Sequence, residues 1–414
     1  MQLLTFLGKN KYSPASYTWK KKQVQTPTPY VAEAFYELYE LVSPGKKIEK
    51  VSVFLTPEAR EAHWEELNKR LSERVFLKDV PIPSGKSETE VWEIFDAVVG
   101  EVEPGAKVLF DITNAFRSIP ILVLLAGAFL QKARNVEIQG VYYGAFEANP
   151  AEPPIFDLTP AIKLLDWLTA TEQFITTGSS IGLGNLLSTI QQDFSSQDRR
   201  QIRPPRLLEK LGNSIQDISR SLELIRSMGV LKETAKFQKI PAEELAKEVG
   251  YFAKPFELLS EQIQQSYGQF ALTDPEKLEN SQSALQKQFL LLRWYVKKEL
   301  GAQAILLARE WVVSAWCVTK GIDDYLDRSK RERMEEELNH TTGKIRIRKP
   351  HLTIVTARSS DDLLAVIWLE LRDYRNDIAH AEMRRDSADA SELQKYVKTQ
   401  LIQNLERLFP KFAV

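Results

Sequence analysis

The sequence predicts an α/β domain built on a doubly wound parallel sheet, followed by an all-α region. Over residues 1–165, short apolar runs typical of buried strands alternate with helical apolar spacing. That alternation is the pattern of a Rossmann-like parallel sheet with helices on both faces. Beyond residue 165 the apolar spacing is mainly that of helices. We therefore expect a sheet domain at 1–165, a helical connector at 166–283 and a helical bundle at 284–414.

The strands are predicted from apolar runs, of which 107–113 is the strongest. They are expected at residues 3–8, 50–56, 75–82, 107–113 and 136–143, with a hairpin-like segment at 17–22. The intervening helices are expected at residues 29–41, 58–74, 88–99 and 119–132.

The helical region is predicted from 3.6-residue apolar spacing and from breaks between helices. Small residues at 176–184 predict a break, and 195–205 reads as an exposed connector. Long helices are expected at 207–228, 284–299, 302–318 and 391–409, and another begins near Pro241. Basic and apolar residues alternate at 344–349, which predicts a strand edge or loop with one cationic face. That face could guide an RNA backbone, or it could simply be solvated.

The composition excludes several classes of protein. The chain has 414 residues, 43% apolar and 27% charged, which is ordinary for a globular protein with a sizeable core. Its net charge of -1 excludes a general basic coat for nucleic acid, so any such contact must be local. The one cysteine, Cys317, lies in an apolar stretch and forms neither a disulfide framework nor a metal cluster. The four histidines lack metal-ligand spacing.

The N-terminal residues do not have the pattern of a signal peptide. The longest apolar run, 120–130, is too short to cross a membrane. We therefore expect a cytoplasmic protein without a membrane partner.

Two loops of the predicted sheet have polar residues suited to an anion. In doubly wound sheets, ligands bind beyond the carboxyl ends of the strands, where the strand order reverses. One loop, after the first strand, contains Gly8, Lys9 and Asn10. The other, 111–118, offers Thr113, Asn114, Arg117 and Ser118 ahead of a helix N-terminus, which favours phosphate. In the alternative interpretation, Thr113 and Asn114 only cap that helix. The glycine-rich motifs of nucleotide triphosphatases and dinucleotide enzymes are absent from the sequence.

A second polar cluster lies near the C-terminus. Arg372, Asn376 and His380 are spaced i, i+4, i+8 on an expected helix, with Arg375 at the edge of the stripe. A histidine can take the proton of a ribose 2′-OH or protonate a leaving 5′-oxygen. An arginine can neutralise the phosphorane between those events, and an asparagine can orient either partner. This predicts RNA cleavage without a metal. One helix supplies one histidine, so two facing copies would complete the site; the alternative is a solvated helix face with an incidental histidine.

An Arg309–Glu310 pair lies inside an apolar helix pattern. One interpretation is a buried or rim salt bridge. The other is that one of the two residues orients Arg375 from a neighbouring helix.

Three stretches and the C-terminal motif together carry a family resemblance. The stretches are 6–12 (FLGKNKY), 54–59 (FLTPEA) and 111–120 (DITNAFRSIP), and they resemble the CARF domain of CRISPR-associated proteins. Arg375-Asn376 followed by His380 resembles the R-x4-6-H signature of HEPN ribonucleases. The chain thus resembles the CARF–HEPN ancillary ribonucleases of type III CRISPR systems.

The resemblance implies a function and its site residues. It implies a homodimer, or a higher multiple of dimers, that cuts single-stranded RNA and needs no cofactor for catalysis. Cyclic oligoadenylate is the implied activator, with cyclic tetra-adenylate the expected ring. The implied catalytic residues are Arg375, Asn376 and His380. The implied activator-binding residues are Gly8, Lys9, Asn10, Thr113, Asn114, Arg117 and Ser118. The alternative is a CARF-type ligand-responsive transcription regulator whose helical half binds DNA or only dimerises.

Overall fold

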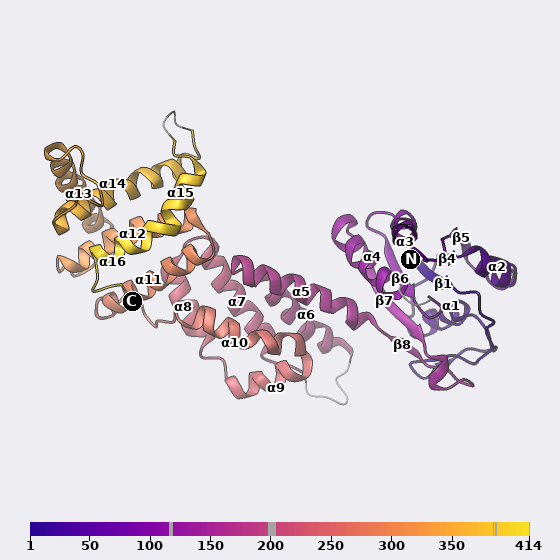
Figure 1. Cartoon of the computed structure of the whole chain (residues 1–414). Helices are drawn as coiled ribbons and strands as arrows, with labels where there is room; N and C mark the ends of the chain where they lie inside the picture. Colours follow the sequence, from indigo (N-terminus) through magenta and orange to yellow (C-terminus); the bar gives the residue numbers. More distant parts are fainter. Residues whose placement is uncertain (116–118, 198–203, 384, 386, 414) are drawn as a thin grey trace. The chain divides into compact units, whose positions relative to one another are not determined.

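The protein forms two compact units, Met1–Asp166 and Trp167–Val414 (Figure 1). The computed structural model describes residues 1–115, 119–197, 204–383, 385 and 387–413. The expected boundary at 165 lies beside the observed one. The expected division at 283 falls inside the second unit, so the separation of connector and bundle stays a prediction.

The first unit contains a six-stranded sheet with the order β5-β4-β1-β6-β7-β8. The pairings from β5 through to β7 are parallel, and β8 pairs antiparallel with β7. The strands are β1 (Gln2–Leu7), β4 (Lys50–Leu55), β5 (Phe76–Pro81), β6 (Lys107–Asp111), β7 (Glu137–Gly144) and β8 (Ile155–Asp157). The expected hairpin is β2 (Thr18–Trp19) with β3 (Lys22–Gln23). Only β8 was not predicted, because its three residues are too few to show a period.

Helices cover both faces of this sheet (Figure 1). They are α1 (Val31–Val42), α2 (Pro57–Leu71), α3 (Glu88–Gly100) and α4 (Ile119–Arg134). Successive side chains of a strand point to opposite faces. Accordingly, Leu3 and Leu7 pack in the core beneath α1 and α2, whereas Leu4 and Phe6 pack beneath α3 and α4. The predicted doubly wound parallel fold is confirmed.

The strand order reverses between β1 and β6, because β1 leads outward to β4 and β5, and β6 leads outward to β7. Both are parallel, so their carboxyl ends lie at the same edge. The loops at 8–10 and 113–115 leave the sheet at this switch point, which is where such sheets bind ligands.

In the described part of the second unit, all the regular elements are helices, which surround one continuous core with residues from Trp167 to Phe412. Its first helices are α5 (Thr159–Thr177), which starts in the sheet unit, α6 (Ile181–Gln197), α7 (Leu208–Glu223), α8 (Ser227–Phe237), α9 (Ala242–Phe252) and α10 (Lys254–Gly268). The later ones are α11 (Ser281–Lys297), α12 (Gly301–Thr319), α13 (Arg328–Arg348), α14 (Ser360–Ala379), α15 (Ala390–Tyr396), the π-helical turn Val397–Leu401 and α16 (Ile402–Leu408). The predicted all-α region is confirmed. Among the helices described, none is long and apolar enough to cross a membrane.

Two local predictions were wrong. The expected single helix at 207–228 is divided between α7 and α8, because Ile225 adopts a left-handed φ of 56° that ends the first helix. Residues 344–348, expected as a strand edge or loop, form the last turn of α13. Ile345 packs against a small core cluster while Ile347 is exposed, so the two isoleucines do not share a face as a strand would require.

Candidate functional site

A cavity of about 840 Å³ opens at the switch point of the sheet. Its lining comes from the ends of four adjacent strands. The lining residues are Gly8, Lys9, Asn10, Tyr12, Thr56, Glu58, Ser84, Gly85, Lys86, Thr113, Asn114 and Ala115. The two predicted loops therefore meet: a Cβ on Gly8 would lie 3.5 Å from the carbonyl oxygen of Asn114. Of the predicted ligand-binding residues, Arg117 and Ser118 lie outside the described residues.

Sequence analysis missed the contribution of the loop after β5. Ser84, Gly85 and Lys86 line the cavity because β5 lies in the same parallel array as β1. Lys86 matters most, because with Lys9 it gives the cavity two exposed ammonium groups against one exposed carboxylate, Glu58. The described lining thus favours an anionic ligand.

The loop after β6 is held by a buried carboxylate. Asp111 is almost fully buried and accepts hydrogen bonds from the hydroxyl of Thr5 at 2.7 Å and from the backbone N–H of Thr113 at 3.0 Å. Burial raises its pKa, against the lowering effect of these hydrogen bonds. The hydroxyl of Thr113 donates to Asp111 at 2.5 Å and accepts from the N–H of Gly144 at 2.8 Å. Thr113 therefore shapes the loop, whereas the Asn114 amide has no hydrogen bond to any described residue.

The loop after β1 is held by an aromatic clamp. The Tyr12 hydroxyl accepts from the N–H of Gly8 at 2.8 Å and donates to its carbonyl oxygen at 3.0 Å. Burial raises the pKa of Tyr12 to about 12, so the hydroxyl stays protonated at neutral pH. Its ring stacks on buried His63, with ring centroids 4.5 Å apart. Nε2 of His63 donates to the carbonyl oxygen of Asn10 at 2.8 Å, since a carbonyl oxygen can only accept. Lys9 and Asn10 are thus displayed on a fixed backbone.

The C-terminal motif lies at the end of α14. The helix begins at an N-cap, Ser359, whose hydroxyl accepts from the N–H of Asp362 at 3.1 Å. Its apolar face packs into the helical core through residues such as Trp368 and Leu371. The helix ends at His380, whose N–H donates to the carbonyl oxygen of Asn376 at 3.0 Å.

Arg375 and Asn376 are half-buried and His380 is exposed. Within the part of the chain that the structure describes, their side chains have no hydrogen bond or ion pair, whereas Arg372 is paired with Asp373. Asn376 and His380 are one turn apart, but Arg375 and His380 differ by about 140° around the helix. One helix therefore presents the imidazole and the guanidinium in different directions. No group of side chains suited to a metal ion occurs among the described residues.

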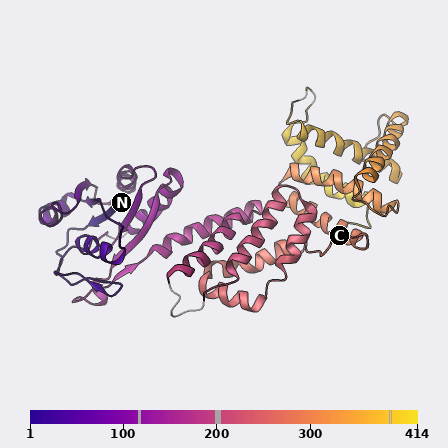
Figure 2. The same cartoon turned by 180° about the vertical axis from the view of Figure 1, so that it is seen from behind.

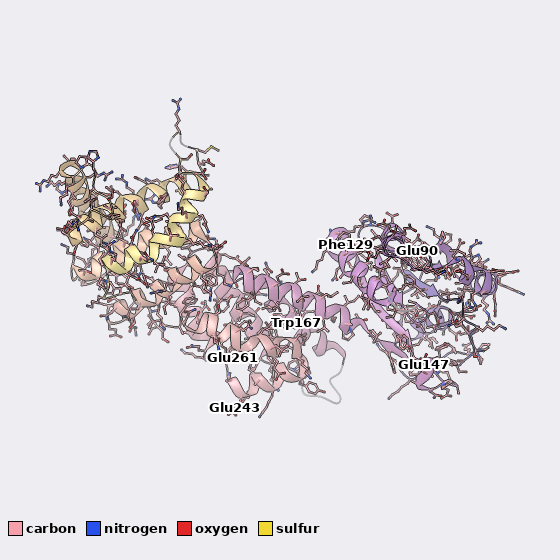
Figure 3. All side chains as sticks on the ribbon, in the orientation of Figure 1. Glu90, Phe129, Glu147, Trp167, Glu243 and Glu261 are labelled. Atoms are coloured by element: carbon pink, nitrogen blue, oxygen red, sulfur yellow. The ribbon has the colours of Figure 1, made fainter. Side chains whose placement is uncertain are left out.

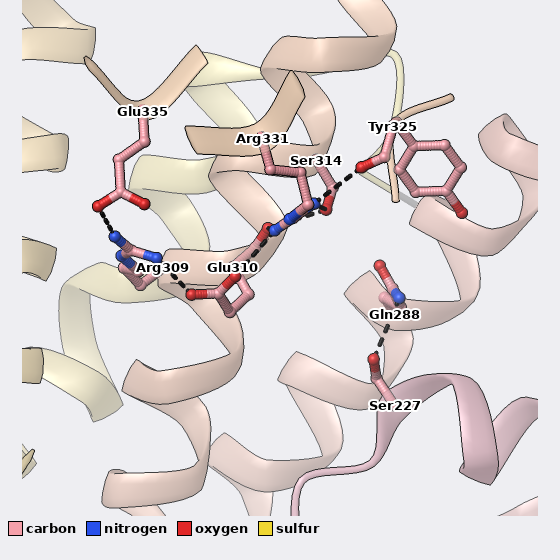
Figure 4. Close-up of polar contacts among 8 residues, drawn as sticks. All are labelled: Ser227, Gln288, Arg309, Glu310, Ser314, Tyr325, Arg331 and Glu335. Atoms are coloured by element: carbon pink, nitrogen blue, oxygen red, sulfur yellow. Dashed lines mark hydrogen bonds and ion pairs between the residues drawn. The ribbon is translucent and has the colours of Figure 1, made fainter. Parts of the chain in front are cut away.

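Arg309 and Glu310 form a structural ion-pair network (Figure 4). Arg309 is buried, donates to Glu310 at 2.5 Å and to Glu335, and its guanidinium lies over the ring of Trp368. Glu310 also accepts from Arg331 at 2.8 Å. Burial would raise the pKa of Glu310, but the two arginines outweigh it and lower that pKa. Among the described residues neither Arg309 nor Glu310 bonds to Arg375, which agrees with the salt-bridge interpretation.

Comparison with known proteins identifies relatives of part of the chain. Residues 163–277 match the family of the second domain of CRISPR-associated protein MJ1674. The CRISPR-associated protein MJ1674 of Methanocaldococcus jannaschii is 28% identical over 177 residues, which cover 40% of this chain and 26% of that protein. The match thus spans little more than a quarter of that relative's length.

One solved structure aligns over most of the chain. Enterococcus italicus Csm6 bound to cyclic hexa-2'-fluoro-hexa-dAMP gives a TM-score of 0.43 and 10% sequence identity, covering 99% of this chain and 94% of that chain. This likeness is too weak to carry a conclusion. Both sequence matches are to a CRISPR-associated protein, which confirms the coarse part of the predicted resemblance. Residues 163–277 of this chain are therefore similar to the second domain of a CRISPR-associated protein.

Proposed function

We propose that this protein is a single-stranded endoribonuclease of type III CRISPR defence that is activated by cyclic oligoadenylate and needs no metal. The sheet unit would be its CARF domain, and residues 284–414 its HEPN ribonuclease domain. The observation that carries the proposal is the end of α14, where Arg375, Asn376 and His380 are accessible and unpaired among the described residues.

The chemistry follows from these three side chains. The ribose 2′-oxygen attacks the adjacent phosphorus, and the bond from phosphorus to the 5′-oxygen breaks. The proton of the 2′-OH is removed by a base and the leaving 5′-oxygen gains a proton, roles for which an exposed imidazole is suited. Arg375 neutralises the charge that develops on the phosphorane. Asn376, one turn from His380, orients the scissile phosphate. The products are a 2′,3′-cyclic phosphate and a 5′-OH.

A complete site needs two copies of the chain. Each α14 offers one imidazole. The reaction removes a proton from the 2′-OH and delivers one to the 5′-oxygen, and two imidazoles suit these two transfers best. The separation of Arg375 and His380 around the helix favours a site where the arginine of one copy and the histidine of the other approach one phosphate. We therefore propose a homodimer, alone or as part of a larger multiple of dimers.

An exposed apolar stripe on α4 supports self-association. Ile121, Leu125 and Phe129 are spaced i, i+4, i+8 and are 64%, 55% and 51% exposed. Figure 3 labels Phe129 on this helix. Phe129 contacts Phe95 of α3, whose neighbour Trp92 is also exposed. Contiguous apolar surface of this kind marks interaction sites. The stripe starts just after the loop that lines the cavity, so a dimer formed here would place two cavities near its seam.

The cavity at the switch point is the proposed activator site. Lys9, Lys86 and the described amides Asn10 and Asn114 can bind phosphates and adenine edges. Gly8 lets the loop after β1 pass close to the loop after β6. Thr113 fixes the loop after β6, which continues in the sequence to Arg117 and Ser118. Cyclic tetra-adenylate is the proposed ring.

The test is a cleavage assay with analysis of the product ends. Fluorescent single-stranded RNA is incubated in EDTA with cyclic tri-, tetra- or hexa-adenylate in turn. We expect cleavage with the tetra-adenylate, 2′,3′-cyclic phosphate ends, and loss of cleavage in His380→Ala with dimerisation and activator binding retained. A strict requirement for Mg²⁺, or 3′-OH and 5′-phosphate ends, would exclude the proposed chemistry.

A further inference from the structure

The second half of α13 and the loop after it form an unusually basic stretch. Residues 338–360 contain five lysines and arginines and no aspartate or glutamate, in a chain whose net charge is -1. Because the stretch is helical to residue 348, its cations are not spread at random. His340, Lys344 and Arg348 are spaced i, i+4, i+8 and so lie along one side of the helix.

Most of these cations are not used to hold the fold. Arg346 donates to the carbonyl oxygen of Leu352 at 2.7 Å, and Lys349 is paired with the buried carboxylate of Asp362 at 2.7 Å. The remaining three, Lys344, Arg348 and Arg358, are exposed, and their side chains have no hydrogen bond or ion pair within the described residues.

The first half of the same helix shows the contrast. Three of its four basic residues are ion-paired. They are Arg328 with Glu332, Lys330 with Asp323, and Arg331 with Glu310. Among the described residues, the second half of α13 thus has two unpaired cations, Lys344 and Arg348, and the first half has one, Arg333. Ile347 of this helix and Val355 of the loop after it are more than 80% exposed.

The basic half of α13 lies at the opposite end of α14 from His380. The two helices pack side by side (Figures 1 and 2) and run antiparallel, since Lys349 pairs with Asp362 and Trp368 donates to Asn339. At a rise of about 1.5 Å per residue, these two pairings place Lys344 about 20–26 Å from His380 along the helix axes. At about 3.4 Å per stacked nucleotide, this separation corresponds to about six to eight nucleotides.

We infer that Lys344, Arg348 and Arg358 form a docking surface for the backbone of single-stranded RNA, remote from the cleavage site. The inference rests on the proposed function for the identity of the polyanion. Unpaired cations in a stretch without aspartate or glutamate can bind a phosphate chain, whose counterions are then released. RNA that extends about six to eight nucleotides beyond the cut would gain these contacts, and shorter RNA would not.

The test measures how RNA binding depends on salt. The full-length chain carrying His380→Ala is titrated with a labelled RNA of about 30 nucleotides at several salt concentrations. It is compared with the same chain carrying Lys344→Gln, Arg348→Gln and Arg358→Gln. Each lost phosphate contact lowers the slope of log K against log salt by about 0.7, so we expect a fall of about 2 and binding about 100-fold weaker near 0.1 M salt. The control replaces three exposed lysines of the same unit with glutamine, Lys239, Lys247 and Lys254, and should keep the original slope.

The outcomes separate this inference from the proposed function. In chains that retain His380, the ratio of kcat/KM for RNA of about 30 nucleotides to that for RNA of about 6 should fall at least tenfold in the triple variant. An unchanged slope, or an equal fall in the control, overturns the docking surface even if RNA is cut. If the slope depends on the three cations but the chain never cuts RNA, the proposed nuclease activity is wrong and the docking surface stands. If the triple variant loses binding to phosphatidylserine vesicles while its RNA slope is unchanged, the surface binds lipid and the assignment to RNA is wrong.

Discussion

Replacing Tyr12 with phenylalanine should loosen the proposed activator site without emptying it. The substitution keeps the ring stacked on His63 and removes the hydroxyl that holds both backbone groups of Gly8. Each hydrogen bond contributes about 0.5–1.5 kcal/mol, so the sheet unit should lose about 1–3 kcal/mol of stability. His63 still holds the carbonyl oxygen of Asn10, so the ligand must then order Lys9 itself, at about 1–2 kcal/mol for one residue fixed. Since about 1.4 kcal/mol is a factor of ten, activator affinity should fall about tenfold.

The assay pairs calorimetric titration of cyclic tetra-adenylate with denaturant unfolding. Tyr36→Phe is the matched control, because the Tyr36 hydroxyl donates to the carbonyl oxygen of Arg74 at 2.9 Å, away from the cavity lining. That variant should lose some stability and keep its activator affinity. Wild-type affinity in Tyr12→Phe would refute the role given to the clamp, and so would an equal loss of affinity in Tyr36→Phe.

Three further variants test other parts of the account. Burial raises the pKa of Glu370, and its Oε2 lacks a hydrogen-bond partner among the described residues. The stability that protonation of Glu370 provides is therefore complete below the ordinary value of 4.5 and is lost as the pH rises through the raised pKa. Glu370→Gln should unfold at a higher denaturant concentration than wild type at about pH 8 but not at about pH 4. Arg309→Met should lower the free energy of unfolding by about 1–2 kcal/mol, because Glu310 keeps its pair with Arg331 and Glu335 keeps contact with water. Arg328→Met removes a surface ion pair and should not change the free energy of unfolding measurably. Leu125→Asp should convert the proposed dimer to a monomer in light scattering and remove RNA cleavage. If the variant is dimeric and active, the interface lies elsewhere.

The sequence was most informative where one local pattern determines structure. The apolar runs of the sheet domain correspond to five strands of its six-stranded sheet, because a buried parallel strand needs little more than a short hydrophobic run. The loop at 113–115, which lines the cavity, could be singled out because it follows the strongest strand. The spacing of Arg372, Asn376 and His380 likewise needed only a helix, and α14 provides it.

What the sequence did not reveal depends on contacts between distant residues. His63 supports Asn10 from 53 positions away, and Lys86 enters the cavity only because β5 lies in the same sheet as β1. The alternation at 344–349 predicted a strand edge or loop, yet six residues of alternation are outweighed by a 21-residue helix that packs against α14. The break at Ile225 interrupts an apolar pattern that continues on both sides, so periodicity alone could not locate it.

The central claim is that a ligand in the sheet domain switches on an imidazole at the end of α14. Its most direct measurement is the rate of RNA cleavage by wild type and His380→Ala, each with and without cyclic tetra-adenylate. A general acid–base residue contributes about 100- to 10,000-fold, so the account predicts fast cleavage by activated wild type alone and a loss of that size in the variant. Equal rates with and without the ligand, or undiminished cleavage by His380→Ala, would contradict it.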